Sequence, residues 1–169
     1  ATGDNAIPLL LSLIAADLLN GYSEMDIVQL QKVFHTGADP MERLMLRPSF
    51  EGGVSQDAGY VLVDDVTSMG GTLAELANYI RLNGGVVLGS IVLVNAGRDK
   101  NFTPIKKHLK ILEERFHDQI RQQFGIHIPA LTANEANYLV GFRTFDEIRN
   151  RCVKAEKETH LRLLSKGIK

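Results

Sequence analysis

Two adjacent carboxylates, Asp64 and Asp65, are followed closely along the chain by a segment rich in hydroxyl groups and glycine. Carboxylates accept hydrogen bonds from hydroxyl groups and bind hard cations such as Mg²⁺. The segment 67–72 offers hydroxyls and unhindered backbone N–H groups, which stabilise a phosphate group when they lie at the start of a helix. This order of residues predicts a site for a ligand that carries both hydroxyl and phosphate groups.

The flanking residues predict a strand before this segment and a helix after it. The apolar run 61–63 is bounded by turn residues, which is typical of a buried parallel strand, and residues 73–80 place apolar side chains at helical spacing. A second apolar run at 86–94 predicts another strand, so the three elements form a right-handed βαβ unit. Ligands of open α/β sheets bind at the carboxyl ends of strands, where both acids are expected.

The segment 61–73 (Val-Leu-Val-Asp-Asp-Val-Thr-Ser-Met-Gly-Gly-Thr-Leu) resembles the 5-phosphoribosyl 1-pyrophosphate (PRPP) binding motif of type I phosphoribosyltransferases. The resemblance implies that Asp64 and Asp65 hold the 2- and 3-hydroxyls of the ribose. It also implies a loop around the 5-phosphate that consists of Thr67, Ser68, Met69, Gly70, Gly71 and Thr72. Met69 departs from the pattern, because the family usually has a small or hydroxyl residue there.

The resemblance further implies an enzyme of nucleotide metabolism. Such an enzyme would use Mg²⁺-bound PRPP as donor and transfer the phosphoribosyl group to a nitrogen nucleophile, a nucleobase or a related compound, with release of pyrophosphate. Mg²⁺ would be held through PRPP, with Asp64 or Asp65 able to contact it through water. No motif identifies the acceptor.

Two other segments receive roles from the same resemblance. Thr2, Gly3, Asp4 and Asn5 look like the loop that binds pyrophosphate, with its preceding strand missing upstream. The irregular stretch 37–59 corresponds to the family's mobile flap.

Arg43 and Arg47 lie in that stretch and are candidate catalytic cations. The alternative interpretation, solvated surface charge, is about as common for two arginines on a loop.

The predicted fold is α/β and type I phosphoribosyltransferase-like, with a mainly parallel sheet flanked by helices and a helical C-terminal region. Residues 1–103 are predicted to form the core, and residues 104–169 are predicted to pack on it or to form part of a hood. The predicted helices outside the βαβ unit are a first helix ending near Asn20-Gly21, a short one capped at 23–26, an amphipathic one from 105 towards Gly125, and two short ones capped by Thr132 with Glu135 and by Thr144 with Glu147.

Net charge, cysteine count and the length of the apolar stretches argue against some classes of protein for this chain. The chain of 169 residues has a formal net charge of -1, so no global field draws it to nucleic acid, and Cys152 is its only cysteine. A single cysteine excludes an internal disulfide and favours a reducing cytoplasm. The apolar stretch 7–19 is too short to span a bilayer, so a membrane is not an expected partner, whereas a homodimer is compatible with the apolar helices.

Other interpretations of the acidic pair remain open. A Walker B element would need a loop ending in Gly-Lys-Ser or Gly-Lys-Thr, which the sequence lacks. A phosphoacceptor receiver domain should carry its acids on the first strand. The acids could also cap a turn with no ligand, and the same fold could serve a non-catalytic regulator that senses PRPP or an assembly module with a vestigial site.

Overall fold

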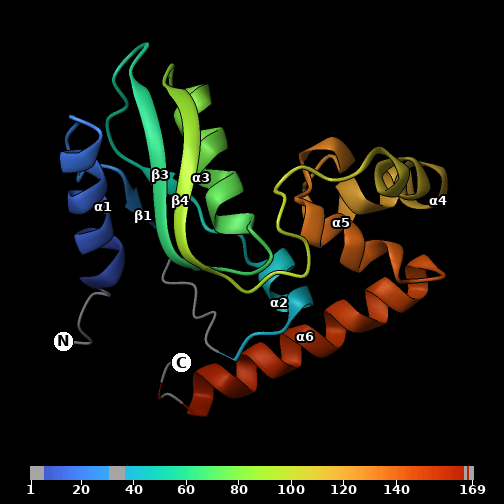
Figure 1. Cartoon of the computed structure of the whole chain (residues 1–169). Coiled ribbons are helices and arrows are strands. Elements are labelled where there is room, and N and C mark those ends of the chain that lie inside the picture. The colour runs from blue at the N-terminus through green and yellow to red at the C-terminus, as the bar shows by residue number, and fades with distance from the viewer. Residues whose placement is uncertain (1–5, 31–36, 166, 168–169) are drawn as a thin grey trace. The chain divides into compact units, whose positions relative to one another are not determined.

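The protein is a mixed α/β fold in the computed structural model, which describes residues 6–30, 37–165 and 167. In chain order the elements are α1 (Ala6–Leu18), β1 (Val28–Gln29), α2 (Pro40–Met45), β2 (Phe50–Glu51), β3 (Gly59–Thr67), α3 (Gly71–Leu82), β4 (Val86–Asn95), α4 (Lys106–Phe124), the 3-10 helix η1 (Ile128–Ala130), α5 (Ala133–Val140) and α6 (Phe145–Ser165) (Figure 1). The predicted α/β class is therefore confirmed. Among the described residues, β1 pairs with β2 antiparallel and β3 pairs with β4 parallel.

The chain folds into two compact units, each of which has its own packing. The first unit contains α1, β1, and residues Pro48–Ser68 and Thr72–Gly97. The second contains α2 with Arg47, the three residues Met69–Gly71, and the chain from Arg98 onward. The boundary predicted after residue 103 stays a prediction.

The first unit is built on the predicted βαβ connection. β3 and β4 run side by side with Leu62 opposite Ser90, and α3 joins them (Figure 1). α3 buries Leu73 and Ile80, while α1 packs against β3. The Tyr79 hydroxyl donates a hydrogen bond of 2.6 Å to the Gly52 carbonyl, which fixes α3 to the segment before β3.

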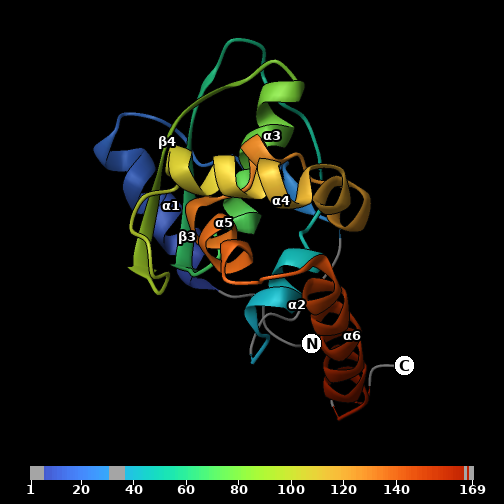
Figure 2. The same ribbon diagram turned by 90° about the vertical axis from the view of Figure 1, so that its right-hand side faces the viewer.

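The second unit holds the main hydrophobic core. α4 is amphipathic and buries Leu112, Phe116 and Ile120 on one face. α2 lies against α6, and α5 lies against α4 (Figure 2). The shared core consists of Met41, Leu44, Leu112, Phe116, Ile120, Ile126, Ile128, Leu131, Ala136, Leu139, Phe145, Ile148, Cys152 and Ala155. Large aliphatic side chains from several helices meet there, so this unit carries most of the buried apolar surface.

Several predicted elements need correction. The segment 23–26 forms no helix, and the cap at Thr144 starts a single helix of 21 residues rather than a short one. The stretch 37–59 is not irregular throughout, because Asp39 and Glu42 form a reciprocal capping box that starts α2 at Pro40. That local signal was missed. In the described part of the chain, no helix is both long and apolar enough to cross a membrane.

Candidate functional site

The acidic pair lies inside β3 rather than beyond it. The strand continues to Thr67, and Asp64 pairs in register with Val92 of β4. Successive side chains of a strand point to opposite faces, so Asp64 and Asp65 project from different faces of the sheet. Each carboxylate also accepts a hydrogen bond from the next backbone N–H, at 2.9 Å for Asp64 and 2.7 Å for Asp65.

Asp64 occupies an environment that disfavours its charge. Burial of the side chain raises its pKa from 3.8 to about 6. The backbone hydrogen bond from Asp65 lowers this pKa, whereas the charge of the Asp65 side chain raises it. Loss of water around a carboxylate disfavours the ionised form. A nearby Mg²⁺ would favour the ionised form, so this carboxylate is suited to respond to a bound cation.

We expect Asp64→Asn to stabilise the protein at pH 7 but not at pH 4. Because the folded pKa is raised, this group contributes stability that is present below pH 3.8 and is lost as pH rises through about 6. The partly exposed side chain is screened by water, so the gain at pH 7 should be only about 1 kcal/mol. Urea unfolding at the two pH values measures it, with the exposed Asp118→Asn as control. An equal effect of Asp64→Asn at both pH values would contradict the expectation.

Directly after β3, the first unit contains side-chain hydroxyls and backbone N–H groups at the start of a helix. Thr67 is buried, and its carbonyl accepts a hydrogen bond of 2.7 Å from the Ala96 N–H. The half-buried hydroxyls of Ser68 and Thr72 have no hydrogen-bond partner among the described residues. α3 begins at Gly71, and the N–H group of Thr72 in its first turn, which belongs to the first unit, lacks a helical acceptor. These groups can bind an anion.

The middle of the loop has packing roles within the second unit. The Thr132 hydroxyl donates to the buried Met69 carbonyl group at 2.5 Å. Gly70 has φ +82°, and a Cβ there would lie 2.9 Å from the Phe102 ring. Only glycine fits both constraints. Gly71 is also tight, since an added Cβ would lie 3.1 Å from the Glu135 carboxylate.

The two arginines of the predicted flap are engaged in the second unit. Arg47 is ion-paired with the buried Glu135, and its Nε lies 3.1 Å from Oε1. Arg43 lies on α2, where its Nε donates a hydrogen bond of 3.0 Å to the Ala38 carbonyl. Burial lowers the pKa of the Arg43 guanidinium. These contacts are structural, and a catalytic role of either arginine finds no support in them.

The predicted pyrophosphate loop, Thr2, Gly3, Asp4 and Asn5, lies outside the described residues. Its role stays a prediction.

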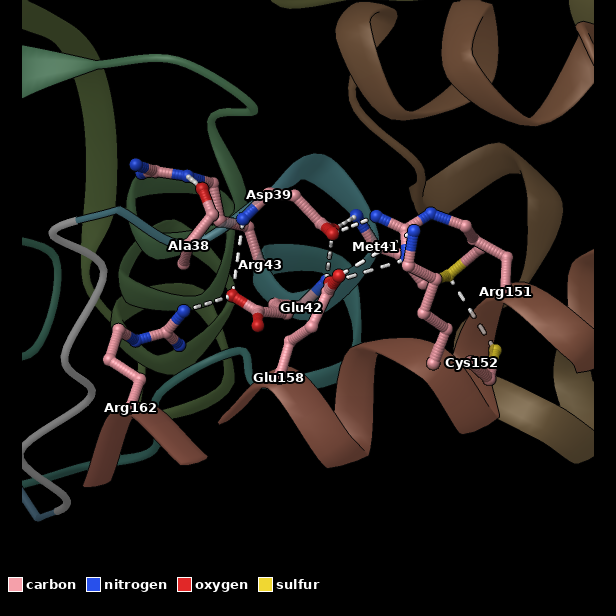
Figure 3. Close-up of polar contacts among 10 residues, drawn as sticks. Ala38, Asp39, Met41, Glu42, Arg43, Arg151, Cys152, Glu158 and Arg162 are labelled. Carbon is pink, nitrogen blue, oxygen red and sulfur yellow. Dashed lines mark hydrogen bonds and ion pairs between the residues drawn. The ribbon is translucent and has the colours of Figure 1, made fainter. Parts of the chain in front are cut away.

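The sequence interpretation missed a charged network between α2 and α6 (Figure 3). Asp39 is ion-paired with Arg151, which also reaches Glu158 at 3.5 Å. The buried Glu42 is paired with Arg162 at 2.6 Å. The only local signal was the capping box of α2, because the arginines lie more than a hundred residues further along the chain.

This network includes a potential cation site. Ligand atoms of Asp39, Glu42 and Glu158 lie within 4.8 Å of one another. The two arginines already offset most of their negative charge, and the Asp39 carboxylate also accepts hydrogen bonds from the first turn of α2. A divalent cation would have to displace these partners, so the network is best explained as an electrostatic contact between two helices.

Comparison with known proteins finds similarity to Protein TraN of Escherichia coli. The two sequences are 36% identical over 162 residues, which cover 94% of this chain but only 36% of TraN. An uncharacterized protein of Haemophilus influenzae is 39% identical over 80 residues, covering 47% of this chain and 18% of that protein. The chain thus spans about a third or less of the curated relatives that it matches. No family model and no solved structure matches it.

These findings overturn the phosphoribosyltransferase interpretation. The similarity over nearly the whole chain is to TraN, and no phosphoribosyltransferase family model matches. The predicted enzyme activity, its place in nucleotide metabolism, and PRPP with an acceptor as partners are therefore wrong, as is the PRPP-sensing alternative. The motif of thirteen residues does not identify the ligand, because a strand followed by a glycine loop and a helix occurs in many proteins that bind different ligands.

Proposed function

We propose that this chain is a non-enzymatic ligand-binding domain of a TraN-like protein. Its first unit binds the phosphate group of a small molecule or macromolecule, with Mg²⁺ as the accompanying cation. The observation that carries the proposal is a succession along the chain: the acidic end of β3, then the Ser68 and Thr72 hydroxyls, for which the described residues offer no hydrogen-bond partner, and then the start of α3. Asp64 and Asp65 lie on opposite faces of the sheet, so one of the two carboxylates would contact the cation, while the hydroxyls and the helix end suit the anion.

The contacts of the two flap arginines favour binding over turnover. The similarity to TraN extends over 94% of the chain, so it includes both the strand-and-loop segment and the helical unit. Arg43 and Arg47, the cations that would neutralise a leaving group, are held in contacts of the second unit. Binding without turnover is consistent with both observations.

Two further features belong to the proposal. We infer that the parallel pair of β3 and β4 is part of a larger, mainly parallel sheet flanked by helices. We also infer a cytoplasmic location, where millimolar Mg²⁺ and phosphorylated compounds are available and where the free, buried Cys152 stays reduced.

Binding can be tested by nuclear magnetic resonance with glycerol 3-phosphate and Mg²⁺. This probe has a phosphate monoester and adjacent hydroxyls. We expect the amide signals of Ser68 and Thr72 to shift, with a dissociation constant of about 1 mM, because a few hydrogen bonds and one charge interaction correspond to roughly 4 kcal/mol. Affinity should fall when Mg²⁺ is removed.

Substitutions locate the site. Thr72→Val and Asp65→Asn should each weaken binding at least about tenfold, the effect of losing roughly one charge-assisted hydrogen bond. Thr103→Val changes an exposed threonine of the second unit and should leave binding unchanged. Absence of any shift at about 10 mM probe would overturn the proposal.

A further inference from the structure

β4 is an apolar strand with one edge that no described residue pairs with. Its ten residues, Val-Val-Leu-Gly-Ser-Ile-Val-Leu-Val-Asn, include no charged side chain. β4 pairs with β3 on one edge, and no described residue pairs with the other. Proteins usually protect such an edge with charges, proline, a bulge or a covering segment, because unpaired N–H and C=O groups recruit another strand. β4 has a register irregularity at Leu88, whereas the stretch from Gly89 to Asn95 pairs regularly with β3 and contains no charge or proline.

Apolar side chains of β4 are exposed on both faces of the sheet. Leu93 is 59% exposed and Val94 is 51% exposed, and these two successive residues of a regularly paired stretch point to opposite faces. A helix packed over the sheet would cover only one of these faces. An additional strand at the edge would place cross-strand neighbours beside both side chains.

Other described elements of the first unit also leave apolar surface exposed. Parallel strands are normally buried on both faces, and a helix that is apolar all round is normally buried. α1 is apolar over most of its surface, with Ser12 and Asp17 as its polar residues, yet only Ala15 of this helix is buried among the described residues. Most of the exposed large apolar side chains of the protein lie in the first unit, whereas the second unit encloses a full core.

We propose that the free edge of β4 pairs with a β-strand from polypeptide outside these 169 residues. The TraN sequence is long enough to contain such a strand outside the matched region, because that region is only 36% of its length. The strand would be apolar on both faces, like β4, and would extend the β3–β4 pair into a larger sheet. This inference is independent of the phosphate site and would survive its failure.

Hydrogen exchange tests the proposal. In this chain alone, β4 amides that face β3 should be protected, and alternate amides that face the free edge should exchange at least tenfold faster. In full-length TraN, the segment that matches 86–95 should be protected throughout, and the segments that match α5 and α6 provide the folded reference in both proteins. Free exchange of alternate amides in full-length TraN would overturn the proposal.

A pair of variants checks that the edge is open in this chain. Leu88→Lys and Leu161→Lys change leucines that are 68% and 64% exposed, in the first and second units respectively. Both should leave the urea midpoint unchanged. A clear fall for Leu88→Lys alone would show that the edge is already covered, and sedimentation as a dimer with all β4 amides protected would identify a second copy as the occupant. Either result would overturn the proposal.

Discussion

Glu135→Ala is expected to destabilise the second unit by about 3–5 kcal/mol, the usual effect of removing one partner from a buried ion pair. The Glu135 side chain is fully buried and pairs with Arg47, whose side chain is only 9% exposed. The same carboxylate accepts a hydrogen bond of 2.8 Å from the Thr132 N–H at the start of α5. The alanine variant would therefore leave a buried guanidinium without this counter-charge, and the Thr132 N–H would lose its acceptor in the capping box of α5.

Urea unfolding followed by far-ultraviolet circular dichroism measures this effect, since the chain has no tryptophan. Glu114→Ala is the matched control, because Glu114 forms an exposed pair with Lys110 at 3.7 Å. It should cost less than about 1 kcal/mol. The double variant Arg47→Met with Glu135→Leu should recover part of the loss, because no unpaired charge remains buried. Equal stability of Glu135→Ala and Glu114→Ala would contradict the buried-pair explanation.

Leu112→Ala is expected to cost about 3 kcal/mol of folding stability. Leu112 lies on the buried face of α4 and is completely inaccessible to solvent. The substitution removes apolar contacts and leaves a cavity that the surrounding helices can fill only in part. Alanine itself favours the helix, so the loss would reflect packing rather than helix propensity.

Two comparisons separate packing from other effects. Leu112→Met nearly preserves volume and should cost less than about 1.5 kcal/mol. Leu161→Ala changes an exposed leucine of α6 and should have little effect. If the exposed and buried leucines gave the same loss in urea unfolding, the assignment of the core to this face of α4 would be wrong.

Local sequence signals predicted much of the secondary structure. The apolar runs and glycine turns gave β3, α3 and β4 because strands and helices impose different spacings on apolar residues. The boxes at Thr132 and Thr144 correctly marked helix starts. The continuity of α6 was not predicted, because its contacts are distant in sequence: Arg151 pairs with Asp39, the N-cap of α2, and Arg162 pairs with Glu42 of α2.

Function was predicted less well than structure. The segment 61–73 does form a strand, a loop and the start of a helix, but that arrangement does not identify a ligand. The similarity to TraN contradicts the predicted phosphoribosyltransferase activity, while the acids and hydroxyls of this segment remain candidates for binding a phosphate and its cation. Local chemistry can specify a kind of site, whereas the identity of the substrate depends on groups contributed from elsewhere in the protein.

The sequence by itself determined the βαβ order and the capping box of Thr132 with Glu135, since both depend on residues close together in the chain. Only the tertiary structure decided that Glu135 is buried against Arg47, 88 residues away, and that Gly70 lies against Phe102. The physical reason is that a charge and its partner, or a glycine and the ring beside it, are brought together by folding. Neither residue carries a local signal of the other.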